Sequence, residues 1–334
     1  MLRCKASQLV EVIWPLVKAD IPVFIHGKSG IGKSQMIRTE LMPLIEREYG
    51  PSVLHDFRLS SKDITDGTGI PTVDQSDKST IWTRPAFIPK DDGKMHVIFL
   101  DEIGHASVQM QHAVGYQLVL DRGLGEYKLP RKHRVILALN IREDKGGDNK
   151  LAGPFQNRGA HVVLDLDQSG WIEYATQRGI DPRLIAFVKL RPEQLHKMSE
   201  TSPAWPSPRT IEMLGKVMRE NRDDLKSIQN AAQGLCGEGF ATEFATFIRD
   251  LGAALPKLSD IKANPSRAKV PDDLHHQYVV ASAISHHIDK ASVDAWVTYL
   301  KRLSPDLASM AAHNAMQRDS ALSDNKTLKA LVMN

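Results

Sequence analysis

Residues 27–34 form the stretch whose residue types and spacing point most directly to chemistry. They read Gly-Lys-Ser-Gly-Ile-Gly-Lys-Ser, an uninterrupted match to the phosphate-binding pattern G-x-x-x-x-G-K-[ST]. The apolar residues 21–26 before the motif predict a strand, and residues 35–42 after it predict a helix, which is the context that the motif requires. In such a loop, backbone N–H groups wrap a polyphosphate, and the lysine and serine side chains reach the phosphates and Mg²⁺. We therefore expect a nucleoside triphosphate to be bound by Gly27, Ser29, Gly30, Ile31, Gly32, Lys33, Ser34 and Gln35.

Two adjacent carboxylates, Asp101 and Glu102, end the apolar segment 95–102. An apolar run followed by Asp-Glu is common, so it has little meaning alone. Downstream of a phosphate-binding loop, the first carboxylate can hold Mg²⁺ and the second can orient and deprotonate the attacking water. We expect Ser34 and Asp101 to be metal ligands and Glu102 to be catalytic.

A polar residue, Asn140, follows the apolar segment 134–139. Beside a phosphate site its side chain could position the attacking water or contact the γ-phosphate. Asparagine is also common at strand ends, where it caps turns. The residue pattern alone favours the capping role and leaves both open.

These residues must be positioned by the elements around them. Apolar segments alternate with helical patterns through the first half of the chain, which predicts an α/β fold with a five-stranded parallel sheet covered by helices on both faces. The strands are expected at 21–26, 53–59, 95–100, 134–139 and 161–166. Two turn-rich stretches, near 70–83 and 121–134, predict β-hairpins inserted between the core elements.

Beyond Asp167 the strand signals stop and helical patterns continue to the end of the chain. We expect an α/β domain at 1–168, a helical domain at 169–262 and a helical extension at 263–334. Four histidines in that extension, His275, His276, His286 and His287, are not spaced to place two ligands on one face, so no metal site is expected there.

The composition and net charge exclude few classes of protein. The 334 residues carry 43 Lys+Arg against 40 Asp+Glu, and a net charge of +3 is too small to indicate a nucleic-acid partner by itself. The two cysteines form no paired motif, which favours a reducing compartment. The sequence contains neither a signal-peptide pattern nor an apolar run long enough to span a membrane, so a cytoplasmic protein is expected.

The phosphate loop, the Asp-Glu strand, the strand-end Asn and the helical domain follow one another along the chain. In this order of motifs the chain resembles an AAA+ ATPase, and more narrowly the MoxR-type branch. The narrower resemblance rests on four further stretches. They are 59–71, Trp82-Thr83-Arg84-Pro85-Ala86-Phe87, 116–127 and Ser207-Pro208-Arg209.

The resemblance implies ATP and Mg²⁺ as ligands and a ring, usually a hexamer, with nucleotide between neighbouring subunits. It implies the phosphate-binding role for Lys33, the sensor 1 role for Asn140, the arginine-finger role for Arg158 and the sensor 2 role for Arg209. Relatives usually carry an aromatic residue after the finger arginine, whereas Gly159 follows here. Arg84 is a second candidate for an inter-subunit role.

The resemblance further implies an ATP hydrolase that remodels or activates a partner protein, in relatives often one with a von Willebrand A-type domain. A nucleic-acid-stimulated motor or loader on the same ATPase core is an alternative, as is a nucleotide-gated scaffold with little turnover. The second hairpin is locally basic, but a solvated hairpin end explains this better than a nucleic-acid contact.

Overall fold

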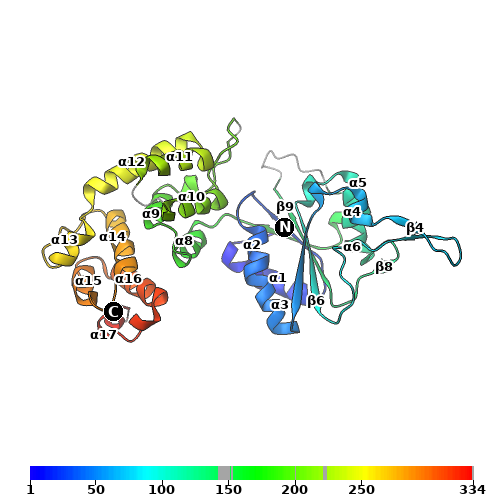
Figure 1. Ribbon diagram of the computed structural model, residues 1–334, viewed down its shortest axis with the longest axis horizontal. Coiled ribbons are helices and arrows are strands. Elements are labelled where there is room, and N and C mark those ends of the chain that lie inside the picture. The colour runs from blue at the N-terminus through cyan, green and yellow to red at the C-terminus, as the bar shows by residue number, and fades with distance from the viewer. Residues whose placement is uncertain (142–150, 152, 200, 221–223, 333–334) are drawn as a thin grey trace. The chain divides into compact units, whose positions relative to one another are not determined.

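The protein is described by a computed structural model that covers residues 1–141, 151, 153–199, 201–220 and 224–332. The chain divides into two compact units, Met1–Asp167 and Gln168–Asn334. The first unit contains the β-sheet, and the second contains helices and no strand among its described residues (Figure 1). The finer division of the second half at residue 262 stays a prediction.

A parallel sheet forms the centre of the first unit, so the predicted α/β class is confirmed. All five predicted strands are present, but the sheet has six. The additional edge strand has only three residues, two of them exposed, so no apolar pattern marks it in the sequence. In spatial order the strands are β1 (Leu2–Cys4), β10 (Ala160–Leu164), β2 (Val23–Gly27), β9 (Arg134–Leu139), β6 (Met95–Asp101) and β3 (Ser52–Arg58).

Side chains of the central strands alternate between two cores, one on each face of the sheet. On β6, Ile98 and Leu100 belong to one core, while Val97 and Phe99 belong to the other. This alternation follows from the two-residue period of a strand. Because both faces are covered, β6 and β9 are buried along their whole length, which explains why the sequence shows them as continuous apolar runs.

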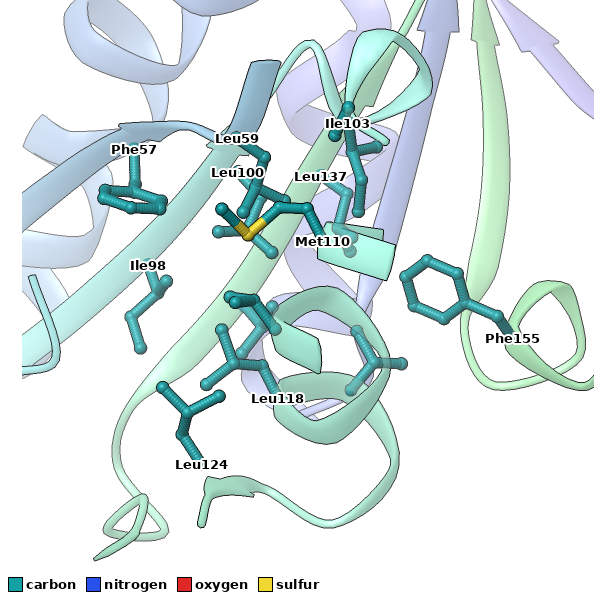
Figure 2. Packing of buried hydrophobic residues seen from close by; sticks show 14 of the residues in the cluster. Phe57, Leu59, Ile98, Leu100, Ile103, Met110, Leu118, Leu124, Leu137 and Phe155 are labelled. Carbon is teal, nitrogen blue, oxygen red and sulfur yellow. The ribbon is translucent and has the colours of Figure 1, made fainter. Parts of the chain in front are cut away.

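Helices cover both faces of the sheet (Figure 1). One face packs against α1 (Leu9–Lys18) and against a long helical stretch that begins at Lys33. This stretch comprises α2 (Lys33–Met36), a π-helical segment (Ile37–Leu41) and α3 (Met42–Tyr49). The other face packs against α5 (Val108–Met110), a π-helical segment (Gln111–Tyr116) and α6 (Gln117–Leu120), and Figure 2 shows Met110 and Leu118 directed into this core.

Both predicted hairpins are present. In the first, β4 (Pro71–Val73) pairs with β5 (Thr80–Trp82), and in the second, β7 (Gly123–Leu124) pairs with β8 (Tyr127–Lys128). The first follows the short helix α4 (Ile64–Thr68) and extends away from it (Figure 1). At its base Gly69 has a φ of +87°, and a Cβ there would lie 1.8 Å from the carbonyl oxygen of Thr83. Only glycine fits this close approach.

The second unit is built from ten α-helices among its described residues. One of them, α16, buries mainly alanines. The helices are α8 (Gln168–Gln177), α9 (Pro182–Leu190), α10 (Pro208–Glu220), α11 (Leu225–Cys236), α12 (Glu238–Ala254), α13 (Leu258–Ala263), α14 (Leu274–His287), α15 (Val293–Leu300), α16 (Pro305–Arg318) and α17 (Lys326–Val332).

In the part of the chain that the structure describes, none of the helices combines the length and apolar character needed to cross a membrane. The described residues also contain no group of three or more His, Cys, Asp or Glu side chains arranged to hold a metal ion. The side chains of His275 and His286 lie outside this description.

Candidate nucleotide-binding site

The phosphate-binding motif forms the connection between strand β2 and helix α2. Two of its glycines, Gly30 and Gly32, have φ values of +76° and +100°, a backbone region that residues with a Cβ rarely adopt. A third, Gly27, packs so closely that a Cβ there would lie 2.7 Å from Ile31 Cδ1 and 3.1 Å from the carbonyl oxygen of Leu164. The glycine spacing of the motif is therefore what allows the chain to follow this path.

The ammonium group of Lys33 lies over the loop that precedes it. Lys33 is 8% exposed, and its Nζ donates to the carbonyl oxygens of Gly27 at 2.7 Å and of Lys28 at 3.0 Å. It also donates to Asn140 Oδ1 at 3.0 Å, although the two residues are 107 positions apart. Strands β2 and β9 are neighbours in the sheet, so their carboxyl ends bring the loop and Asn140 together.

Ser34 and Asp101 also meet at this edge of the sheet. Ser34 Oγ donates to Asp101 Oδ2 at 2.6 Å, and Asp101 is 5% exposed at the end of β6. A hydroxyl and a carboxylate are the hard oxygen ligands that Mg²⁺ prefers, commonly together with substrate phosphates and water. The donor set thus fits the metal that the sequence predicts.

Glu102 adopts an unusual backbone conformation directly after β6. Its φ is +56°, in the left-handed region that is uncommon for a residue other than glycine. Its carboxylate accepts a hydrogen bond from Ser60 Oγ at 3.1 Å, and its backbone N–H donates to Asp101 Oδ1 at 3.0 Å. Strained backbone of this kind concentrates at functional sites.

Sequence reasoning missed Ser60 and also Arg58, whose Nε lies 4.0 Å from Asp101 Oδ2. Both follow or end strand β3, which is the neighbour of β6 in the sheet. Polar residues at the carboxyl ends of adjacent parallel strands converge, so a signal exists once the strand order is known. The strand order itself is not readable from the chain.

His26, the fourth residue of β2, is a further residue beside the loop, and no sequence motif assigns it a role. Its Nε2 lies 2.8 Å from His161 Nδ1 on the neighbouring strand β10. Burial, the nearby His161 and then Lys33 lower the pKa of His26 to about 4. The imidazole beside the loop is therefore neutral at pH 7.

The two arginines that the resemblance singles out lie away from this cluster in the chain. Arg158 is exposed, between α7 (Gly153–Gln156) and β10, and has no ion-pair partner among the described residues. Arg209 is exposed in the first turn of α10 and belongs to the second unit. Arg84, by contrast, donates to the carbonyl oxygen of Ile88 and lies 5.9 Å from the Tyr127 ring centroid, so its guanidinium is used within the unit.

No family model matches the sequence, and no curated protein matches it either. Solved structures to which the chain is similar include the following three. NtrX from Brucella abortus in complex with ADP is 16% identical over 97% of this chain and 68% of its own, with a TM-score of 0.41. A putative ATPase from Cytophaga hutchinsonii is 10% identical, and the match covers 98% of this chain and 80% of that chain, with a TM-score of 0.35. A RuvB variant from Thermotoga maritima is 15% identical, and the match covers 89% of this chain and 88% of that chain, with a TM-score of 0.41. Similarity at this level does not assign the chain to a family.

Proposed function

We propose that the protein is a Mg²⁺-dependent ATP hydrolase of the AAA+ class and, within it, of the MoxR-like branch. One observation carries the proposal: the side chains of Lys33, Asn140, Ser34, Asp101 and Glu102 converge at the carboxyl ends of β2, β9 and β6. In open parallel sheets this edge is where ligands bind.

Each of these groups has a role that suits its chemistry. The loop backbone and the Lys33 ammonium bind the phosphates, and Asn140 orients the lysine through its Oδ1. Ser34 and Asp101 hold Mg²⁺, which supplies positive charge to neutralise the phosphate oxygens. Glu102 accepts a proton from the attacking water, and Ser60 fixes one carboxylate oxygen before that step.

The assembly we propose is a homo-hexamer in which Arg158 of one subunit acts on the ATP of its neighbour. Support comes from the exposure of Arg158 and from the absence of an ion-pair partner among the described residues. A planar, permanently charged guanidinium suits the charge that develops during phosphoryl transfer. Arg209, in the second unit, has the sensor 2 role that the resemblance implies.

The activity we propose for the assembly is the remodelling of a partner protein, one with a von Willebrand A-type domain being the first candidate. The nucleic-acid alternative is disfavoured because three of the basic residues near the second hairpin are used internally. Arg122 Nη1 lies 2.6 Å and Arg134 Nη1 lies 3.5 Å from Asp20 Oδ1, and Lys132 Nζ donates to the carbonyl oxygen of Gly93 at 2.6 Å. Their charge is partly neutralised or fixed within the first unit.

The decisive experiment is the variant Glu102→Gln in the full chain. We expect ATP hydrolysis to fall by more than about 10²-fold while the dissociation constant for ATP stays within about twofold, because the change removes the base and keeps the phosphate contacts. Equal hydrolysis by Glu102→Gln and the parent chain would refute the assignment, and an absence of hydrolysis in the parent would support the scaffold alternative.

Three further measurements test the assembly and the partner class. Specific ATPase activity is expected to fall on dilution to the monomer, since each site needs Arg158 of a second subunit. Stimulation of the ATPase by single-stranded or duplex DNA or RNA would favour a nucleic-acid motor over partner-protein remodelling. Capture of a von Willebrand A-type protein by the Glu102→Gln variant in ATP is the expected result.

A further inference from the structure

The turn that carries Arg158 is attached to the strand that leads into the phosphate-binding loop. Phe155, 1% exposed, lies with its ring edge toward Phe24 of β2, at 5.4 Å between ring centroids. Figure 2 shows the Phe155 ring pointing toward the helical stretch that contains Met110 and Leu118. Gly115 in that stretch leaves room for it, since a Cβ there would lie 3.2 Å from Phe155 Cζ. The N-terminal side of the turn is thus anchored in the core.

The C-terminal side of the turn passes directly over β2. A Cβ on Gly159 would lie 2.5 Å from the carbonyl oxygen of Pro22 and 2.7 Å from the Phe24 ring. The next residue, Ala160, donates its N–H to the same Pro22 oxygen at 2.9 Å. This close approach leaves no space for the aromatic residue that the resemblance leads one to expect after Arg158.

His161, which directly follows the second attachment, makes three contacts. Its ring stacks on Phe24 at 4.5 Å between centroids and an angle of 7°. Its Nε2 lies 2.6 Å from the carbonyl oxygen of Gln156, and its Nδ1 lies 2.8 Å from His26 Nε2. A carbonyl oxygen only accepts, so in the neutral ring His161 Nε2 donates and Nδ1 accepts from His26. The hydrogen bonds therefore run in one direction, from His26 through His161 to Gln156.

We propose that His161 is a positioning residue that links the strand of the phosphate-binding loop to the turn bearing Arg158, and so holds that arginine in the pose needed to reach a neighbour's ATP. The inference rests on the proposed function, in particular on the role of Arg158. The direction of the hydrogen bonds is set by the carbonyl oxygen of Gln156, which can only accept.

The first test is the variant His161→Phe in the full-length protein. Phenylalanine keeps the stack on Phe24 but removes both hydrogen bonds, so Arg158 loses its alignment while the loop keeps its phosphate contacts. We expect kcat to fall about 10- to 100-fold, as small misplacements of a catalytic group do, with the dissociation constant for ATP within about twofold. His161→Gln, whose amide can both donate and accept, is expected to recover part of the loss.

A second imidazole pair in the same sheet provides a matched control. His55 Nε2 lies 2.8 Å from His96 Nδ1, with ring centroids 5.1 Å apart, the same separations as in the His26–His161 pair. His96 Nε2 also faces an oxygen, Asp92 Oδ1, at 2.8 Å. His96→Phe therefore removes equivalent bonds from strands that do not lead to Arg158, and its kcat is expected to stay within about twofold of the parent.

A glycine pair tests the same turn without touching a hydrogen bond of His161. Gly159→Ala places a methyl group against Pro22 and Phe24, whereas Gly153→Ala, in the same helix–turn segment, meets nothing within 4 Å. We expect Gly159→Ala to lower kcat with ATP affinity retained, and Gly153→Ala to leave both unchanged. This pair carries the test if His161→Phe does not fold.

Combination with Arg158→Ala separates positioning from a general structural effect. If His161 acts through Arg158, the double variant has the kcat of Arg158→Ala alone; multiplied losses would overturn the inference. Retained kcat in Arg158→Ala would instead refute the arginine-finger role within the proposed function. A loss in Arg158→Ala combined with parent-like kcat in His161→Phe would overturn the inference and leave the ATPase proposal standing.

Discussion

The hydroxyl of Ser34 donates a 2.6 Å hydrogen bond to Asp101 Oδ2, joining the start of the helix after the phosphate-binding loop to the end of a buried strand. The two residues are 67 positions apart in sequence. Their approach depends on the sheet, in which β9 lies between β2 and β6. The metal site we propose is therefore a product of the strand order.

Substitution of Ser34 by alanine is expected to raise the Mg²⁺ concentration needed for half-maximal ATPase activity by about tenfold or more, because one hard ligand is lost. The measurement is a Mg²⁺ titration of hydrolysis at saturating ATP. Ser227→Ala is the matched control, since Ser227 Oγ donates to Asp224 Oδ2 at the same 2.6 Å on the surface of the second unit. An unchanged Mg²⁺ dependence in Ser34→Ala would contradict the metal assignment.

Asn140→Ala removes the side-chain oxygen that faces Lys33 Nζ. We expect kcat to fall on the order of 10²-fold, as when one polar group of a preorganised site is deleted, with a smaller effect on ATP affinity. Single-turnover hydrolysis and nucleotide titration separate the two effects. Asn314→Ala, on α16 of the second unit, is the control, and a parent-like rate in Asn140→Ala would leave this residue only its turn-capping role.

His133 leads to a prediction about stability and pH. Its side chain is 0% exposed, and neither ring nitrogen has a hydrogen-bond partner among the described residues. Burial and then the nearby His96 lower its pKa from 6.5 to about 4. Below pH 6.5 the unfolded chain takes up a proton that the folded protein does not, so stability is complete above pH 6.5 and is lost as the pH falls toward about 4.

The expected loss from this one histidine is about 2–3 kcal/mol across that range. It is measured as the fall in the thermal unfolding midpoint between pH 7 and pH 4.5. His133→Phe, which keeps the ring volume, is expected to reduce the fall, whereas the exposed His112→Phe is not. An identical pH profile for His133→Phe and the parent would contradict the prediction.

Two glycines with nearly equal φ angles allow the packing at the first hairpin to be measured. Gly69 has a φ of +87° and Gly93 a φ of +82°, but only at Gly69 does a Cβ collide with backbone. We expect Gly93→Ala to cost about 1–2 kcal/mol from conformation alone, and Gly69→Ala to cost more. Equal shifts in the two unfolding midpoints would show that the backbone at the hairpin base can move to accommodate the methyl group at no loss of stability.

The sequence was sufficient to predict the parallel sheet, both hairpins and the local surroundings of the loop, because each produces a recognisable pattern within a short stretch of residues. It also placed Asp101 and Asn140 at strand ends, from which their meeting follows. Ser60 and His161 were not predictable, since their partners are defined only when β3 pairs with β6 and β10 pairs with β2. The absence of an aromatic residue after Arg158 is explained only by the structure, in which the space around Gly159 is too small for a side chain.

The contact between Lys33 and Asn140 has a further consequence for how the chain acquires its function. Residues that lie 107 positions apart cannot meet until the β2–β9 pairing has closed a long stretch of chain. A nucleotide bound at this site would hold together strands whose pairing joins distant parts of the sequence. ATP would thus bind the native sheet and not the unfolded chain, so the unfolding midpoint would rise with ATP concentration and the folded protein would be protected from proteolysis.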